Sequence, residues 1–193
     1  MQRELLHIHI QGSQLSADEL LVINKWRVKE LQSSTIWGPD TLSAFGTSEI
    51  FLLKDSKTLE TLAFARLRPV SIWIREKEIL IWGIGAVISI ERGRGFGRIL
   101  MSDITKFLDG TKADSIRKCI IGFSDPVVSE FYRKLGFEIL PVGATHFVYI
   151  DENNRRINTD TPDDVIFYPK QNYILSQLIA DPKLEVTHYM PHW

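Results

Sequence analysis

An apolar run that passes through a glycine-rich turn into an amphipathic helix constrains this chain more than any other feature. The run covers residues 78–90, and the turn from Arg92 to Gly97 reads R-G-R-G-F-G. Apolar side chains then recur at helical spacing up to Leu108, so one face of a helix can pack on a sheet. Glycine tolerates positive φ and leaves the backbone open to a ligand. The first amides of such a helix lack partners within it and point into the turn, which predicts a phosphate cradle.

Two common nucleotide-binding motifs do not fit this segment. The dinucleotide fingerprint requires a glycine directly after the strand and an acidic residue about 20 residues later at the end of a second strand, and the chain has neither. No Gly-Lys-Ser/Thr follows the turn, which excludes a P-loop. A purely structural connection between a strand and a helix remains an alternative at this point.

Two segments resemble the hallmark motifs of the GNAT acyltransferases. The turn matches the pyrophosphate-binding pattern R/Q-x-x-G-x-G/A, with Arg92, Gly95 and Gly97 in the three fixed places. Residues 131–137 read F-Y-R-K-L-G-F, which is similar to the family's second motif, F-Y-x-K-L-G-F. The order and separation of the two motifs are also those of the family. The resemblance implies an α/β (α+β) fold, with a mixed central sheet of about seven strands and helices on both faces.

Length and composition predict an ordinary globular protein. A chain of 193 residues fits a single domain, 1–193, and a net charge of −1 argues against nucleic acid as the main partner. No apolar run reaches the ~18 residues of a membrane span, and residues 1–10 lack the apolar core of a signal peptide. We therefore expect a cytoplasmic protein without a membrane partner. Cys119 is the single cysteine, so neither an intrachain disulfide nor a zinc cluster of thiolates can form.

Alternation, capping residues and turn signals predict the other elements. Ser16 and Glu19 form a capping box before one helix, and Asp125-Pro126 begins another. Residues 172–179 are apolar enough for an added strand or a dimer contact, and a homodimer stays open because relatives often dimerise through terminal strands. Strands are expected at residues 5–10, 49–54, 61–70, 78–90, 116–123, 145–150 and 165–168, with a long hairpin loop at 151–163.

The resemblance implies acetyl-CoA as the co-substrate and no metal. In the family, the pyrophosphate lies on the amides of the glycine turn, and the pantetheine arm pairs like an extra strand with the strand before it. An exposed strand edge suits an extended arm that carries amides, and a backbone amide there can stabilise an oxyanion. For Arg94 and Arg98, a solvated position at the helix start is the alternative. The implied cofactor-binding residues are Gly85, Ala86, Val87, Arg92, Gly93, Arg94, Gly95, Phe96, Gly97, Arg98 and Asp125, the last of which stands where many relatives carry Asn.

Tyr132 matches the tyrosine that the family uses as the general acid toward the leaving CoA thiolate. A phenol with an ordinary pKa near 10 is protonated at neutral pH and can donate its proton. The alternative is a helix tyrosine that packs in the core. The general base is not identified, because many relatives carry a strand glutamate where residues 81–84 read I-W-G-I. His146, Asp163 and Asp164 are candidates, although a lone histidine in a strand is more often structural.

The C-terminal segment resembles the aminoglycoside 2′-N-acetyltransferases. These enzymes carry T-P-D-D before the last strand and end on a tryptophan, and this chain reads T-P-D-D at residues 161–164. Seven acidic and four basic residues give residues 151–193 a net charge of −3, which suits a polycationic acceptor. The relatives end in Asp-Val-Trp rather than Pro-His-Trp and carry a strand glutamate in place of Gly83. Substrate-binding candidates are Trp37, Asp40, Gly83, Ile84, Asp164 and Trp193.

The leading hypothesis is an N-acetyltransferase that transfers an acetyl group from acetyl-CoA to a primary amine by direct attack in a ternary complex. The leading acceptor is a small aminoglycoside-like amino sugar. Other small amines, peptide N-termini and protein lysines stay open, and so do acyl groups other than acetyl. A catalytically weak CoA-binding module is the alternative from a different class. The missing strand carboxylate favours that alternative, whereas the glycine turn and Tyr132 argue against it.

Overall fold

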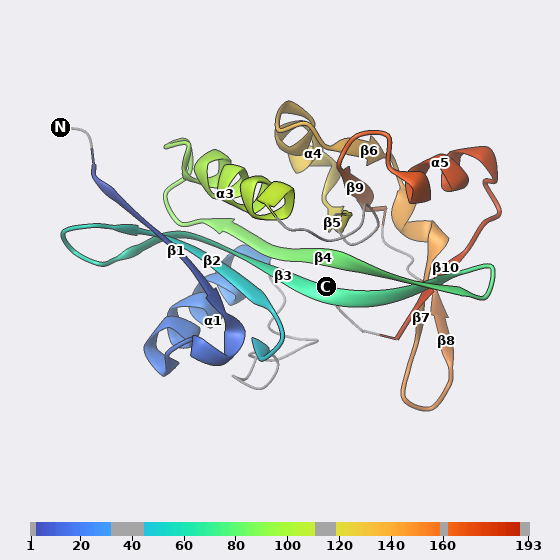
Figure 1. Ribbon diagram of the computed structural model, residues 1–193, viewed down its shortest axis with the longest axis horizontal. Coiled ribbons are helices and arrows are strands. Elements are labelled where there is room, and N and C mark those ends of the chain that lie inside the picture. The colour runs from blue at the N-terminus through green and yellow to red at the C-terminus, as the bar shows by residue number, and fades with distance from the viewer. Residues whose placement is uncertain (1–2, 32–44, 111–118, 159–161, 190–193) are drawn as a thin grey trace. The chain divides into compact units, whose positions relative to one another are not determined.

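The computed structural model describes residues 3–31, 45–110, 119–158 and 162–189 (Figure 1). The chain divides into two compact units. Unit 1 comprises residues 1–68 and 85–108, and unit 2 comprises residues 69–84 and 109–193. Two long strands, β3 (Thr61–Ile74) and β4 (Lys77–Ser89), contribute residues to both units. The single domain inferred from chain length stays a prediction.

Unit 1 places two helices on opposite faces of a sheet. β1 (Leu5–Gln11) pairs antiparallel with β2 (Glu49–Asp55), and β2 pairs antiparallel with β3. Alternate side chains of β2 point to opposite faces of the sheet. On one face, Ile50 and Leu52 pack in a core with Ile23 of α1 (Ala17–Leu31). Phe51 points the other way, and its ring lies 5.7 Å from that of Phe107 in α3 (Phe96–Gly110). Figure 1 shows α1 and α3 on the two sides of these strands.

Unit 2 combines short strands with two helices. β5 runs parallel to β4 and antiparallel to β9, which also pairs with β6. β10 lies between β3 and β7, and β7 forms a hairpin with β8. Buried apolar side chains such as Ile121, Phe147 and Phe167 form the core. The bounds are β5 (Ile120–Ser124), α4 (Pro126–Lys134), β6 (Glu138–Leu140), η3 (Gly143–His146), β7 (Phe147–Ile150), β8 (Arg156–Asn158), β9 (Asp164–Tyr168), α5 (Tyr173–Ala180) and β10 (Val186–His188).

The expected fold class is confirmed, because parallel and antiparallel pairs coexist and helices cover the sheet. The described residues contain ten strands rather than about seven. The additional strands β6, β8 and β10 have three residues each. Three residues are too few to show a periodic pattern, which explains why the sequence did not reveal them.

Three local expectations need correction. Of the two alternatives for residues 172–179, the added strand is wrong, because Tyr173–Ala180 form helix α5 and the Asn172 side chain caps it by accepting the Ile174 N–H at 2.9 Å; the dimer contact stays a prediction. Ile174, Leu175 and Leu178 are buried at helical spacing, which a strand could not place on one face. His146 lies in η3 rather than in the expected strand, and β7 begins one residue later, at Phe147. The expected loop 151–163 contains β8.

The capping box of α1 offers a test of this local structure. The Glu19 N–H donates to Ser16 Oγ at 3.2 Å, and the Ser16 N–H donates to the Glu19 carboxylate at 3.1 Å. We expect Ser16→Ala to lower the free energy of unfolding by about 1 kcal/mol, because one helix amide loses its acceptor. Urea unfolding measures the change. Ser176→Ala, within α5, should leave the midpoint nearly unchanged, and a Ser16→Ala midpoint equal to that of the wild type would contradict the cap.

Candidate active site

The glycine turn of unit 1 joins the end of β4 to the start of α3. Gly93 and Gly95 have φ of +76° and +81°, in the left-handed region that favours glycine. No atom lies within 4 Å of a Cβ built at either residue, so the turn needs glycine for its backbone conformation and not for packing. The Gly95 carbonyl accepts the Ile99 N–H at 3.1 Å. The amides of residues 96–98 therefore precede this first helical bond and can donate to an anion.

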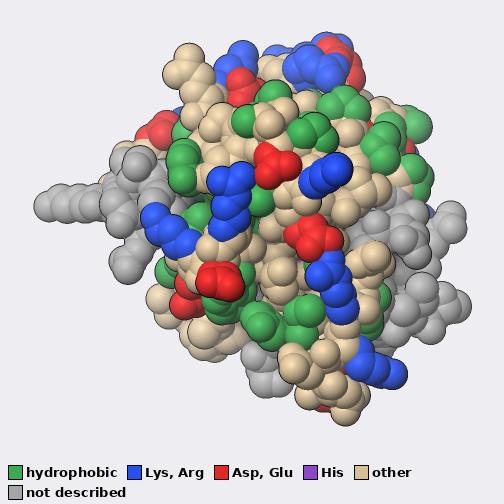
Figure 2. Space-filling model, turned by 90° about the vertical axis from the view of Figure 1, so that its right-hand side faces the viewer, with side chains coloured by type: hydrophobic (Ala, Val, Ile, Leu, Met, Phe, Trp, Pro, Cys, Tyr) green, Lys and Arg blue, Asp and Glu red, His purple; other side chains and the backbone are tan. Residues whose placement is uncertain are grey.

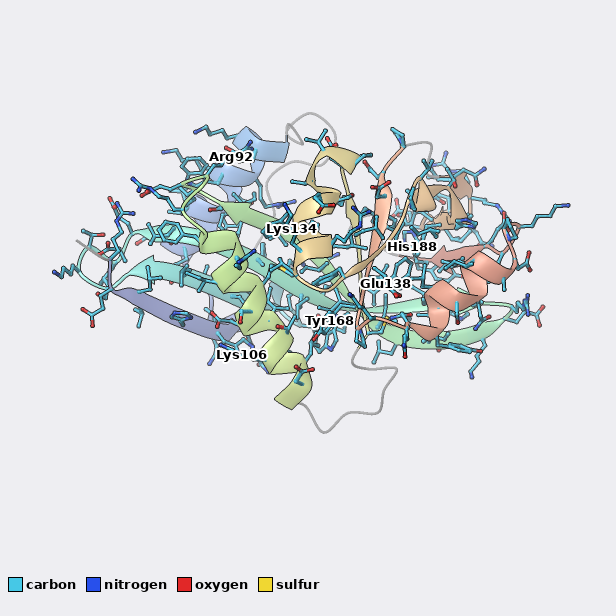
Figure 3. All side chains as sticks on the ribbon, turned by 90° about the horizontal axis from the view of Figure 1, so that it is seen from above. Arg92, Lys106, Lys134, Glu138, Tyr168 and His188 are labelled. Atoms are coloured by element: carbon cyan, nitrogen blue, oxygen red, sulfur yellow. The ribbon has the colours of Figure 1, made fainter. Side chains whose placement is uncertain are left out.

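Arginine side chains around the turn are accessible but already face carboxylates. Arg92 forms an ion pair with Glu30 in the last turn of α1, and Figure 3 shows Arg92 beside that helix. Arg94 lies 3.8 Å from Glu91. Phosphate groups at the turn would compete with these carboxylates. No sequence pattern indicates the Glu30 contact, because 62 positions separate the two residues.

A second backbone irregularity lies in β4, within unit 1. Ala86 has a φ of +52° although it sits inside a strand. The left-handed conformation costs an L-residue roughly 1–2 kcal/mol, and such strain is concentrated at functional sites. The left-handed conformation at Ala86 also interrupts the regular geometry of the strand. Gly85, Ala86 and Val87 are half-buried, so a peptide group turned outward here could donate to an extended ligand or an oxyanion.

Gly83 and Ile84 belong to unit 2, where β4 runs beside β5. The parallel register pairs Gly83 with Ile121. The Ile84 side chain is only 5% exposed, and a Cβ at Gly122 would lie 2.5 Å from its Cγ2 atom. Because the Ile84 side chain packs inward, a substrate could reach this residue mainly through its backbone.

Two sequence candidates lie at the two ends of α4. The Asp125 carboxylate accepts the Val127 N–H at 2.8 Å, so it caps the helix. The Tyr132 ring is buried between Phe131 and Phe137, with centroids 5.1 Å and 5.6 Å away. Burial raises the pKa of Tyr132 to about 12, because the phenolate would lose its hydration. The phenol therefore keeps its proton at neutral pH, as a general acid must.

The structure describes only some of the remaining substrate-binding candidates. Trp37, Asp40 and Trp193 lie outside the described residues. Asp164 is buried, and its two oxygens accept the Ser129 hydroxyl at 2.6 Å and the Val142 N–H at 3.0 Å. A substrate amine would have to reach a carboxylate that is 6% exposed and already accepts two hydrogen bonds. No sequence pattern points to Ser129 as a partner of Asp164, because 35 positions separate the two residues.

The alternative bases include His146, whose Nδ1 lies 3.0 Å from the Leu184 carbonyl. Because a carbonyl only accepts, Nδ1 carries the proton of this bond. The contact ties η3 to the segment before β10, which gives His146 a structural role. Residues 81–84 carry no carboxylate that could serve as the general base instead of His146.

Arginines pair with three of the seven acidic residues of the C-terminal segment 151–193, here called the acidic extension. Asp151 pairs with Arg155 at 2.7 Å, Asp181 pairs with Arg75 at 3.0 Å, and Glu185 pairs with Arg156. Figure 2, which faces the side of α5 and the β7–β8 hairpin, shows Lys/Arg and Asp/Glu side chains interspersed. Arg155 and Arg156 are already counted in the formal charge of −3, whereas Arg75 lies outside residues 151–193 and offsets one further negative charge.

A separate hollow in unit 1 has a volume of 420 Å³. Its lining includes four carboxylates, those of Asp18, Glu19, Glu60 and Glu91. Lys54 also lines it, but this amine lies 2.6 Å from Glu19. Phosphates would be repelled by this lining, so the hollow does not suit the donor.

Metal and membrane features are also absent from the part of the chain that the structure describes. There, no three His, Cys, Asp or Glu side chains gather closely enough to hold a metal ion. None of the described helices is both long and apolar enough to cross a membrane.

The order of strands and helices, with a glycine turn leading into α3, is that of the GNAT acyltransferase fold, and solved structures confirm it. Escherichia coli ElaA is 22% identical over 85% of this chain and 99% of its own, with a TM-score of 0.55. An acyl-CoA N-acyltransferase from Pseudomonas aeruginosa is 18% identical over 85% and 99%, with a TM-score of 0.58. Arabidopsis thaliana NAA60, solved in complex with acetyl-CoA, is 10% identical over 85% and 96%, with a TM-score of 0.53. No sequence-family profile and no curated protein sequence matches the chain.

The conformation of the glycine turn yields a prediction. Gly95→Ala meets no steric obstacle, but its positive φ costs an L-residue roughly 1–2 kcal/mol, so the turn should shift its amides. We expect CoA affinity to fall by about tenfold, which isothermal titration calorimetry can measure. Gly136→Ala is the matched control, because Gly136 has a φ of +90° and equally open surroundings. Equal affinity losses in both variants would contradict the role of the turn.

The Arg92–Glu30 pair yields a second prediction. Glu30→Gln removes the carboxylate that competes with phosphate for Arg92, so CoA should bind more tightly. Because exposed ion pairs contribute less than about 1 kcal/mol, we expect a gain of about two- to threefold that shrinks as salt rises. Glu185→Gln breaks a comparable pair with Arg156 and should not change the affinity. Weaker CoA binding by Glu30→Gln would contradict the competition.

Proposed function

We propose that this protein is an N-acetyltransferase that uses acetyl-CoA to acetylate a primary amine. The observation that carries the proposal is the glycine turn at the start of α3, set in a chain with the GNAT fold. Its free helix amides match the chemistry of a pyrophosphate, and the resemblance assigns them that ligand. A fold shared with NAA60, whose crystal structure contains acetyl-CoA, adds support.

The proposed reaction is a direct transfer. The neutral amine attacks the thioester carbonyl, a C–N bond forms and the C–S bond breaks. A backbone amide near Ala86, whose φ of +52° departs from regular strand geometry, would stabilise the oxyanion. Tyr132 would give its proton to the leaving thiolate, which becomes the CoA thiol. The proton that the amine loses then restores the phenol of Tyr132, so the net products are the amide and the thiol. The raised pKa of Tyr132 keeps the phenol protonated at neutral pH and also makes it a weaker acid than an ordinary tyrosine, so the role rests on the motif match.

An amino sugar is the proposed acceptor, on the strength of the T-P-D-D sequence at residues 161–164. The internal ion pairs of the acidic extension weaken the argument from charge, so the acceptor rests on this resemblance. Other small amines and peptide or protein amines are the competing acceptors. A thiol-release assay with acetyl-CoA and a panel of all these amines separates them. Thermal stabilisation by CoA without turnover on any amine would favour the CoA-binding module.

Removal of the phenol hydroxyl tests the chemical step. We expect Tyr132→Phe to lower turnover by about 10²-fold, because a general acid typically contributes at least that factor. CoA affinity should stay nearly unchanged. Tyr173→Phe, at an exposed tyrosine of α5, should turn over like the wild type. Unchanged turnover in Tyr132→Phe would remove Tyr132 from the mechanism.

The pH dependence of the same reaction gives a second readout for Tyr132. Because its pKa is raised to about 12, the phenol stays protonated well above pH 10. The wild-type kcat should therefore show no fall with a midpoint near 10, the ordinary pKa of tyrosine. Such a fall, absent from Tyr132→Phe, would contradict the buried position of the phenol.

A further inference from the structure

Helix α4 buries two residues, Ser129 and Tyr132, with 3% and 9% of their surface exposed. The other side chains of the helix are exposed or half-buried. Residues three apart lie on the same face of a helix, so the serine and the tyrosine point into unit 2 together. A polar serine on this buried face needs a partner, because an unpaired hydroxyl would lose its hydration without compensation.

That partner is a carboxylate from another element. The Ser129 hydroxyl donates to Asp164 Oδ2 at 2.6 Å, and Asp164, the first residue of β9, is 6% exposed. The second oxygen, Oδ1, accepts the Val142 N–H at 3.0 Å. One carboxylate thus links α4, β9 and the turn before η3. The Ser129 hydroxyl lies 3.5 Å from the Asp125 carbonyl, too far to compete with Asp164 for its proton.

The chemistry of this contact favours a carboxylate at residue 164. Both neighbours of Asp164 donate, and an ionised carboxylate only accepts. Hydrogen bonds to a charged acceptor are about twice as strong as neutral ones, and burial makes them stronger still. Asparagine would fill the same volume and could keep both contacts if its Oδ1 accepted the Val142 N–H and its NH2 group donated to the Ser129 oxygen, but both hydrogen bonds would then be neutral and weaker. The geometry therefore uses the charge of Asp164 rather than its shape.

Apolar contacts alone hold the Tyr132 ring less firmly. Its neighbours Phe131 and Phe137 meet it edge to face, and the orientation of such aromatic pairs contributes only about 0.5–1.5 kcal/mol beyond their burial. The hydrogen bond one turn away is directional and fixes where this face of α4 sits. A misplacement of about 1 Å can cost 10²-fold in rate. We propose that Ser129 and Asp164 form a positioning pair that holds Tyr132 in place for proton transfer; this inference rests on the proposed function.

The test is a double-mutant cycle on turnover. Ser129→Ala and Asp164→Asn are each made in the wild type and in Tyr132→Phe. In the wild-type background each should lower kcat by about tenfold, with the KM values for acetyl-CoA and the amine within about twofold. In the Tyr132→Phe background neither should lower kcat further, because the proton donor is already gone. Ser176→Ala, another helical serine of unit 2 that bonds a backbone carbonyl, is the control with wild-type kcat.

Two kinetic outcomes would overturn the proposal. Equal losses of kcat in both backgrounds would mean that the pair supports the fold in general. A raised KM for the amine with unchanged kcat in Asp164→Asn, together with wild-type behaviour of Ser129→Ala, would make Asp164 a substrate ligand. Ser129→Ala also keeps the test valid if Asp164→Asn does not fold.

A structural readout separates failure of this inference from failure of the proposed function. The ring centroids of Tyr132 and Phe137 are 5.6 Å apart, close enough for nuclear Overhauser effects between their ring protons. Ser129→Ala and Asp164→Asn should weaken these effects, and Ser176→Ala should not. This measurement needs no turnover, so it holds even if no amine is acetylated. Unchanged effects in both pair variants would overturn the positioning pair.

Discussion

The backbone N–H groups at the start of α3 impose the constraint on which the donor site depends. They precede the bond from Ile99 to Gly95, so the helix itself cannot satisfy them. The arginines around them are different, because Glu30 and Glu91 already face Arg92 and Arg94. Side-chain charge can be neutralised by neighbours, whereas helix amides keep their direction and partial charge. The glycine turn therefore presents donors to the proposed diphosphate whose direction no internal carboxylate changes.

Features with a local backbone cause could be predicted from the sequence. The glycines at positive φ, the Ser16 capping box and the Asp125-Pro126 helix start all lie where expected, because each depends on residues a few positions apart. Long-range contacts could not be predicted: no pattern joins Ser129 to Asp164. The positive φ of Ala86 could not be predicted either, since alanine does not indicate a left-handed conformation as glycine does. For residues 172–179, the added strand that was one of two alternatives is replaced by helix α5, because a short apolar run fits a strand or a helix equally well.

The two interpretations of Tyr132 that the sequence left open are compatible in the structure. A tyrosine packed in the core and a tyrosine that donates a proton had been alternatives. Burial between aromatic rings disfavours the phenolate and raises the pKa, so packing itself keeps the proton in place. The same burial leaves little freedom to adjust the hydroxyl. The position of α4 then matters for the chemistry, and the carboxylate of Asp164 gains a role that its T-P-D-D sequence did not suggest.

The charge of the C-terminal extension illustrates why composition is a poor guide to a ligand. A net charge of −3 over residues 151–193 suggests a cationic acceptor, but Asp151, Asp181 and Glu185 already pair with arginines. A polycation at these carboxylates would gain only the difference between its own attraction and that of the arginine it displaces. For exposed pairs this difference is a fraction of about 1 kcal/mol. In the proposed acetyltransferase, selection among amines would therefore depend on the shape and hydrogen bonds of the acceptor site more than on net charge.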